Sequence, residues 1–355
     1  MFRATWQATE KNKINVFADV QNYMVRGRGD FTAPEAHTVW SFWPAGLYQA
    51  TWNAPVTNRL LLEAGASVTR NDFPGSHAQS TDVFGFTVPT TDVTIAEAST
   101  GFRYNARATY SPVHIQYRVV ERFSTSYVTG SHAFKVGMQW QQGVSDVDTF
   151  VNSDGLNTAC ADCPVQYTFL NGAPNRITQW ATPYLQKNRI KADLGIFAQD
   201  QWSIKRLTFN YGLRLDYFNS YVPEQHIPAN AFVAERTFAP ISGVPEWTDL
   251  NPRLGASYDL FGTGRTALKS SLGRYVGVMG INVASANNPI LTSVNNTSRV
   301  WNDANGNYIP DCDLRNFGAN GECTAIDNTN FGRSNPNATR YAEDMIRGFG
   351  KRDYF

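Results

Sequence analysis

The chain has 355 residues and a formal net charge of +1, and only 17% of its residues are charged, against about 25% in typical soluble domains. This balanced charge, without a basic patch interleaved with aromatic residues, argues against nucleic acid as a partner. No apolar run approaches the roughly 20 residues of a transmembrane helix.

Alternating apolar and polar residues start at the beginning of the chain. Phe2, Ala4 and Trp6 alternate with polar residues directly after Met1. A signal peptide instead has a charged segment followed by an apolar one, and this pattern does not occur at these residues. We therefore expect the chain to begin inside a strand, as a fragment of a larger domain. Residues 14–23 predict the returning strand of a first hairpin.

The same paired pattern recurs along the chain. Because successive side chains of a strand point to opposite sides, each alternating segment predicts a strand with one apolar and one polar face. The further pairs are residues 47–56 with 59–70, 115–130 with 134–143, 192–204 with 207–217, and 251–262 with 265–277. Additional strands are predicted near residues 101–110, 165–172, 175–184 and 288–294, which gives roughly a dozen strands or more.

Short turns close the hairpins, whereas long segments join one hairpin to the next. The turns are predicted at Thr57–Asn58, Ser131–His132, Lys205–Arg206 and Thr263–Gly264. The long segments are rich in Gly, Pro, Asn, Asp and Ser, and they comprise residues 75–92, 145–164, 223–247 and 302–348. Short turns at one rim of a sheet and long loops at the other are typical of outer-membrane barrels.

Three interpretations of the apolar face are open at this point. In a soluble barrel or sandwich the face packs inward, in a membrane barrel it contacts lipid, and the third possibility is a secreted adhesin. Strands of about 10 residues favour lipid, because tilted strands of that length cross the hydrocarbon. Aromatic residues near the predicted strand ends suit the belt at a membrane surface, namely Trp52, Trp140, Trp202, Tyr217 and Tyr275.

Four segments in order resemble the barrel of TonB-dependent outer-membrane receptors. They are "LGIFAQDQWSIKRLTFNYGLRLDYF", "NPRLGASYDLFGTGRTALKSSLGRY", "WNDANGNYIPDCDLRN" followed by "NGEC", and "TRYAEDMIRGFGKRDY". The nearest resemblance is to the Oar-like group, whose members carry an N-terminal carboxypeptidase-regulatory-like domain. The match is specific from about Leu194 to the end and looser from Phe2 to Gly143. Such receptors have about 22 strands and a plugged lumen.

The resemblance implies an all-β fold, an antiparallel transmembrane β-barrel with long extracellular loops. Residues 1–355 are then part of a single barrel domain from which the plug, the TonB box, the signal peptide and the closing strands are absent. A terminal aromatic such as Phe355 also marks the last strand of many outer-membrane proteins. We expect truncation instead, because Lys351, Arg352 and Asp353 do not form an alternating strand.

The function implied by the resemblance is active import across the outer membrane of a Gram-negative bacterium. The implied partners are outer-membrane lipid, the TonB complex through the missing N-terminal part, and an extracellular ligand that the sequence does not name. The alternatives are a passive porin-like channel and a surface adhesin. We expect no enzyme, because the sequence has no HExxH motif, phosphate-binding loop or G-x-S-x-G elbow, and Asp193, Asp200 and Asp216 are expected to line the lumen.

All four cysteines fall in the long loops. Cys160 and Cys163 have the spacing of a redox or zinc half-site, but no second pair completes a zinc set and no βαβ pattern surrounds them. Because the cell surface is oxidising, we expect two local disulfides, Cys160–Cys163 and Cys312–Cys323, that stiffen loops.

The segment "DANGNYIPDCD" offers oxygen ligands at the alternating spacing that opens a calcium loop, from Asp303, Asn305, Asn307 and Asp311. Glycine occupies the fourth place of the segment instead of the sixth, and Leu314 replaces the closing glutamate. The segment therefore predicts either a calcium site or an Asx-rich turn without metal, and no other cofactor is expected.

Overall fold

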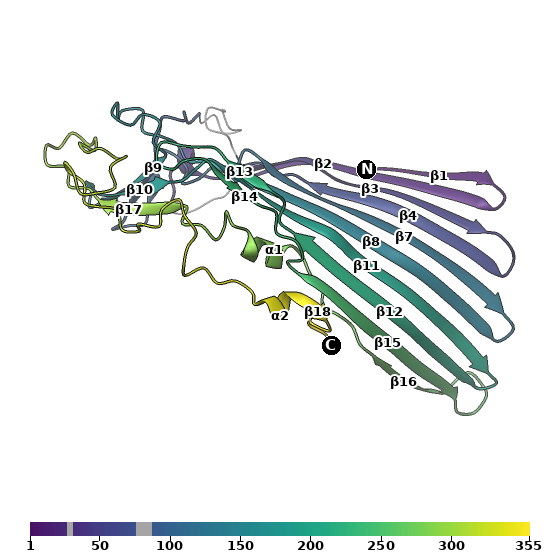
Figure 1. The fold of residues 1–355 in the computed structure, drawn as a ribbon. Helices are drawn as coiled ribbons and strands as arrows, with labels where there is room; N and C mark the ends of the chain where they lie inside the picture. The colour runs from purple at the N-terminus through teal and green to yellow at the C-terminus, as the bar shows by residue number, and fades with distance from the viewer. Residues whose placement is uncertain (27–30, 76–86) are drawn as a thin grey trace.

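A single long antiparallel sheet, which we call the wall, dominates the computed structural model, and the structure describes residues 1–26, 31–75 and 87–355 (Figure 1). Ten of its strands lie side by side in the order β1-β2-β3-β4-β7-β8-β11-β12-β15-β16. Their bounds are Phe2–Thr9 (β1), Asn12–Arg26 (β2), Val39–Pro55 (β3), Leu60–Asn71 (β4), His114–Thr129 (β7), His132–Thr149 (β8), Tyr184–Ile204 (β11), Leu207–Tyr221 (β12), Glu246–Asp259 (β15) and Ala267–Gly273 (β16).

Short turns lie at one end of the wall and long connections at the other (Figure 1). The turns comprise residues 10–11, 56–59, 130–131, 205–206 and 260–266. Lys205 and Gly130 have positive φ angles of 51° and 54°. Such angles are what two-residue hairpin turns require, because they match the twist of the flanking strands. The five predicted hairpins are confirmed, although His132 already belongs to β8.

The long connections contain the remaining elements. These are η1 (Pro34–Ala36), β5 (Ile95–Glu97), β6 (Arg103–Tyr104), β9 (Val165–Leu170), β10 (Ala173–Trp180), β13 (Gln225–Ile227), β14 (Arg236–Phe238), α1 (Asn282–Asn287), β17 (Asn296–Val300), α2 (Glu343–Ile346) and β18 (Arg347–Phe349). Strand β18 pairs in parallel with β15 at the loop end of the wall. Among the described residues, no helix is both long and apolar enough to cross a membrane.

Cross-strand register places the apolar residues of neighbouring strands on one face of the wall. Val136 of β8 and Leu213 of β12 both pair with Ala198 of β11. Val136 and Leu213 are 45% and 48% exposed, so the described chain leaves this face uncovered. The alternate positions, such as Lys135 and Gln199, pair across the opposite, polar face.

A small core lies at the loop end of the wall. Phe218 of β12 and Trp247 of β15 are buried there against Val283 and Ala284 of α1 and Ile346 of α2. Phe218 pairs directly with Trp247 in the register of the two strands. The segment after β16 therefore folds back over the end of the wall.

Some local predictions are wrong. Residues 288–294 form turns instead of a strand, because the Asn288 side chain accepts the Ile290 amide while Ile290 itself is fully buried. Within the predicted strand at 101–110, Arg103–Tyr104 forms a two-residue strand and Tyr110 forms an isolated bridge to Phe150, and the residues between them are not in a strand. Trp140 lies in the middle of β8, not near its end. In the predicted loop 75–92, residues 76–86 lie outside the described residues.

Candidate functional site: the loop assembly and the polar face of the wall

The long connections form a second sheet, which we call the loop sheet, in the order β17-β10-β9-β5-β6. Strands β5 and β6 come from the connection between β4 and β7, and β9 and β10 come from the connection between β8 and β11. Strand β17 follows the last long strand of the wall. Three segments far apart in the sequence therefore combine at the end opposite the turns (Figure 1).

The loop sheet has a hydrophobic core of its own. Tyr167 and Phe169 of β9 and Ile177 of β10 are buried against Trp301, which follows β17. The ring centroids of Tyr167 and Trp301 are 5.0 Å apart, within the range of favourable aromatic pairs. These long connections thus form a packed unit, since a core of this kind offsets the entropy of ordering the chain.

Both cysteine pairs border this core. The structure joins Cys160 to Cys163 and Cys312 to Cys323, and all four side chains are buried. Arg315 connects the two closed loops, because its Nη1 donates to the Ala159 carbonyl at 3.0 Å and its Nη2 lies 2.5 Å from an Asp162 carboxylate oxygen.

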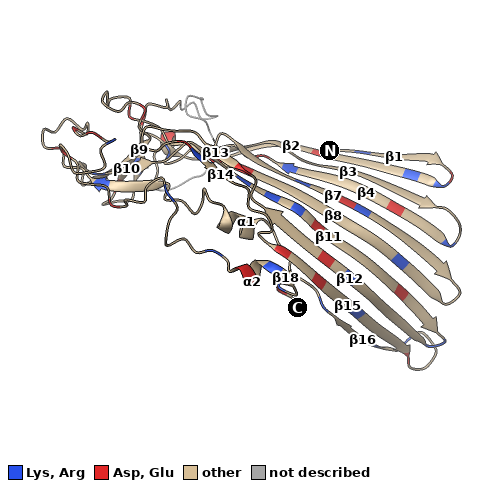
Figure 2. Cartoon of the chain, in the orientation of Figure 1, with Lys and Arg blue, Asp and Glu red and all other residues tan. Residues whose placement is uncertain are grey.

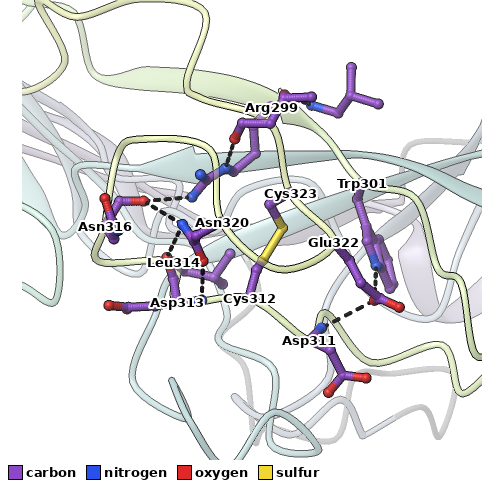
Figure 3. Close-up of a disulfide and its surroundings, with 12 residues drawn as sticks. Arg299, Trp301, Asp311, Cys312, Asp313, Leu314, Asn316, Asn320, Glu322 and Cys323 are labelled. Atoms are coloured by element: carbon purple, nitrogen blue, oxygen red, sulfur yellow. Dashed lines mark hydrogen bonds between the residues drawn. A yellow bond between two sulfur atoms is a disulfide. The ribbon is translucent and has the colours of Figure 1, made fainter.

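A buried arginine organises the longer closed loop. Arg299 of β17 is 1% exposed and donates to the carbonyl oxygens of Thr324, Asn316 and Gly318 at 2.7, 3.0 and 2.7 Å. Figure 3 shows the bond to Asn316 beside the Cys312–Cys323 disulfide. Asn320 adds a bond from its Nδ2 to the Asn316 carbonyl at 3.2 Å. Three backbone carbonyls converge on one guanidinium. These hydrogen bonds fix the shape of the loop, in addition to the disulfide that closes it. Neither Arg299 nor Asn320 was predicted from the sequence, since nothing near Arg299 in the sequence marks it as buried.

Two acidic side chains of the loop assembly have structural partners. Tyr167 Oη donates to an Asp154 carboxylate oxygen at 2.6 Å, and burial raises the pKa of Tyr167 well above its usual value. Tyr167 is therefore a neutral donor at physiological pH. The Glu97 carboxylate accepts from the Ser99 hydroxyl and from the amides of Asn171 and Gly172, which lowers the pKa of Glu97 to about 2.

The four candidate calcium ligands lie together in one exposed loop. Asp303 accepts the amides of Gly306 and Tyr308 at 3.0 and 3.1 Å. The Nδ2 atoms of Asn305 and Asn307 donate to Asp311 Oδ2 at 2.5 and 3.0 Å. These are the contacts of an Asx-rich turn. Calcium coordination requires oxygen atoms, so both amide groups would have to rotate before binding.

The other metal candidate is at the shorter disulfide. The sulfur atoms of Cys160 and Cys163 and a carboxylate oxygen of Asp162 lie within 4.8 Å of one another. In the structure the two sulfur atoms are bonded to each other and Asp162 pairs with Arg315. Metal coordination at this position would require thiolates, so it competes with the disulfide.

An open cleft of about 580 Å³ lies between the segment that precedes Cys160 and the loop closed by Cys312–Cys323. Residues 157–159 line one side, and residues 309–313, Asn320 and Gly321 line the other. Its polar lining residues include Asp311, Asp313 and Asn320. The Asn320 amide group is bonded to backbone groups of its own loop, whereas carboxylates such as those of Asp311 and Asp313 have several acceptor sites and can also accept hydrogen bonds from a polar ligand.

The polar face of the wall carries several ion pairs. Lys135 Nζ of β8 lies 3.0 Å from a Glu63 carboxylate oxygen of β4, across the intervening β7, and Arg274 Nη2, just after β16, lies 3.0 Å from a carboxylate oxygen of Asp249 in β15. Arg214 Nε donates to Asp216 at 2.8 Å. Gly195 makes room for that arginine, because a Cβ at this position would overlap the guanidinium. The charged side chains therefore lie along the wall.

Asp200 does not share a face with Asp193 and Asp216, so the expectation that all three line the lumen is wrong. Asp200 lies on the apolar face and is 4% exposed. Its carboxylate accepts from Tyr211 Oη at 2.7 Å and lies 2.7 Å from His132 Nδ1. The physical reason is the strand period of two, because Asp200 has the same parity as the apolar residues of β11.

A wall with one apolar and one polar face, short turns at one end and folded loops at the other defines an outer-membrane β-barrel protein. The sequence matches the model of the outer membrane beta barrel domain over residues 1–344, so the chain belongs to this family. It is accordingly a protein of the outer membrane of Gram-negative bacteria. No curated protein matches the sequence.

Solved structures of outer-membrane proteins are similar to this chain in fold. The outer membrane transporter YddB from Escherichia coli matches with a TM-score of 0.50 at 11% identity, over 84% of this chain and 36% of the transporter. The chain thus spans about a third of the length of that protein. The ferric-catecholate import receptor Fiu from E. coli K12 has a TM-score of 0.45 at 12% identity, over 84% of this chain and 47% of the receptor.

Proposed function

We propose that this chain forms part of the barrel wall and the ligand-capturing loops of a TonB-dependent outer-membrane receptor of the Oar-like group, which imports a ligand actively. The observation that carries the proposal is the loop assembly, in which three connections fold into one sheet above a polar-faced wall. Long loops with a core of their own are a stable surface for recognition, whereas short or unpacked loops suffice for an open pore.

The cleft beside the loop closed by Cys312–Cys323 is the proposed place of first contact with the ligand. One of its walls belongs to this disulfide-closed loop and the other directly precedes Cys160, so we expect its polar groups to be ordered, which lowers the entropy lost on binding. The polar face of the wall then surrounds the path of the ligand, and the TonB complex supplies energy through another part of the receptor. The similarity to a transporter in fold supports this role and favours transport over catalysis.

A passive porin-like channel is the alternative, and conductance distinguishes the two. The full-length protein that carries this chain is inserted into planar bilayers, and its potassium chloride conductance is measured. A receptor with a plugged lumen gives no steady open-channel current, whereas a porin does. A steady current would contradict the proposal.

Uptake supplies the second measurement. Culture medium is compared by untargeted mass spectrometry after growth of wild-type cells, cells without the receptor gene and cells without TonB. The proposal expects at least one compound that only wild-type cells deplete. A compound depleted equally well without TonB would indicate passive entry, and no receptor-dependent depletion in any rich medium would favour an adhesin.

A further inference from the structure

Basic residues are concentrated in the five turns of the wall. We call residues 10–11, 56–59, 130–131, 205–206 and 260–266 the hairpin rim. The rim contains one acidic residue, Glu10, and five basic residues, all of them exposed: Lys11, Arg59, Lys205, Arg206 and Arg265. The whole chain has a net charge of only +1, so this end is far more positive than the rest of the molecule. Figure 2 shows basic positions at the ends of the hairpins.

Contacts within the rim leave most of this charge available. Asp259, the last residue of β15, uses its carboxylate oxygens to accept the amides of Gly262 and Gly264 at 3.0 and 2.8 Å, and of the rim cations it attracts Arg206. Lys11 Nζ donates one hydrogen bond to the Val56 carbonyl at 2.7 Å. An ammonium group has three donors, so Lys11 keeps capacity for a second partner.

Aromatic side chains border the rim on the apolar face. Trp202 is two residues from the end of β11, and Tyr258 pairs with Leu207 at the start of β12. Trp202 and Tyr258 are 37% and 42% exposed, and Phe261 within the last turn is 67% exposed. Tryptophan and tyrosine side chains prefer the headgroup region of a bilayer. The aromatic residues therefore place the basic rim at the level of the headgroups or just outside it.

We infer that the hairpin rim binds the phosphate groups of anionic phospholipids in the adjoining leaflet of the outer membrane. Lysine and arginine extend apolar stems along the hydrocarbon boundary and place their charges among the phosphates. The rim is continuous with the exposed apolar face. A single lipid molecule therefore contacts the basic rim with its headgroup and the apolar face with its acyl chains. An acidic protein would contact the charges alone and would not account for the neighbouring aromatic side chains.

The test uses the full-length protein reconstituted in nanodiscs that contain equal amounts of phosphatidylethanolamine and phosphatidylglycerol. Lipids that remain bound after exchange into detergent are quantified by mass spectrometry. Because one basic residue near an anionic surface contributes about 1 kcal/mol, we expect phosphatidylglycerol to be enriched about five-fold. Raising the salt from about 0.1 to 1 M shortens the Debye length from about 10 to 3 Å and should reduce the enrichment.

The test variant combines Arg59→Gln, Lys205→Gln and Arg265→Gln, one change in each of three turns. The matched control removes three exposed basic residues elsewhere, with Arg333→Gln, Arg340→Gln and Lys351→Gln. We expect the rim variant to lose most of the enrichment, the control to keep it, and both to retain the heat-resistant folded band. Equal enrichment in both variants, or none in the wild type, would overturn the inference, as would charge-dependent capture of an acidic protein without lipid preference. The readout is lipid composition, so it does not depend on ligand import.

Discussion

Replacing Leu213 by arginine is expected to destabilise the barrel strongly. Leu213 lies near the middle of β12 on the apolar face, between Ala198 and Pro252, and it is 48% exposed. In the membrane this exposed surface contacts lipid. A charged side chain on the lipid face of a barrel costs about 2–4 kcal/mol near the bilayer midplane and about 0–1 kcal/mol near the interfaces. Because Leu213 lies near the middle of β12, we expect the cost for Leu213→Arg to fall in the range for the bilayer midplane.

The matched control is Asn210→Arg in the same strand. Asn210 is exposed on the polar face, where it pairs with Gln201 and Gly255. An arginine there stays in contact with water, so we expect a change below about 1 kcal/mol. Both variants add the same charge to β12. The difference between their stabilities therefore measures the effect of lipid compared with water around the new arginine.

The free energy of unfolding of both variants is measured by urea titration of the full-length protein in lipid vesicles. The loss of the heat-resistant band reports the fraction of unfolded protein. A cost of about 2–4 kcal/mol changes the folded-to-unfolded ratio by about 30- to 1000-fold. If Asn210→Arg were the more damaging of the two, the assignment of the faces would be wrong. If neither substitution had an effect, the apolar face would not contact lipid at this level.

Three further predictions concern the loop assembly. Maleimide labelling should find no free thiols in the protein exported to the cell surface. The double variant Cys312→Ser, Cys323→Ser should lose about 3 kcal/mol of local stability, so that protease cleaves this loop. Unchanged protease resistance would show that the disulfide does not stabilise the loop. Calcium at about 0.1–1 mM, the range of many extracellular modules, should give a heat of binding that Asp303→Ala abolishes, and no heat up to several millimolar would leave the Asx-rich turn. The pKa of Glu97 is depressed to about 2, so its contribution to stability is complete above its unfolded pKa of about 4.3 and is lost as the pH falls towards 2. The Gly172 amide resonance should titrate in that window and stop doing so in Glu97→Gln, and a titration that survives the substitution would assign it to another group.

Local sequence patterns determined the wall. The five hairpins, the two faces of each strand and the rim with the short turns all follow from the alternation of residues and from turn positions. The position of a residue in this alternation also decides on which face of the wall its side chain lies. Asp200 lies on the apolar face because it is in phase with Ile196 and Ala198, so the alternation outweighs the charge of the side chain in deciding its face.

Residues without such a period depended on the tertiary structure. The segment 288–294 is apolar enough for a strand, but the Asn288 side chain accepts the Ile290 amide and the Asn295 side chain donates to the Ile290 carbonyl, and both bonds favour turns. Arg299 shows the same limit, because its three carbonyl acceptors belong to residues 316–324 and no spacing between an arginine and distant backbone carbonyls is a sequence signal.

The sequence by itself therefore determined what each strand presents to its two sides, since that property repeats every second residue within one segment. The tertiary structure alone decided that β5, β9 and β17 share one sheet and that Tyr167 and Trp301 share one core. These partners are separated by up to two hundred residues or so, and the closure of such loops is rewarded only when all segments pack together. Long-range packing of this kind leaves no period in the sequence, and it is what shapes the proposed ligand-capturing surface.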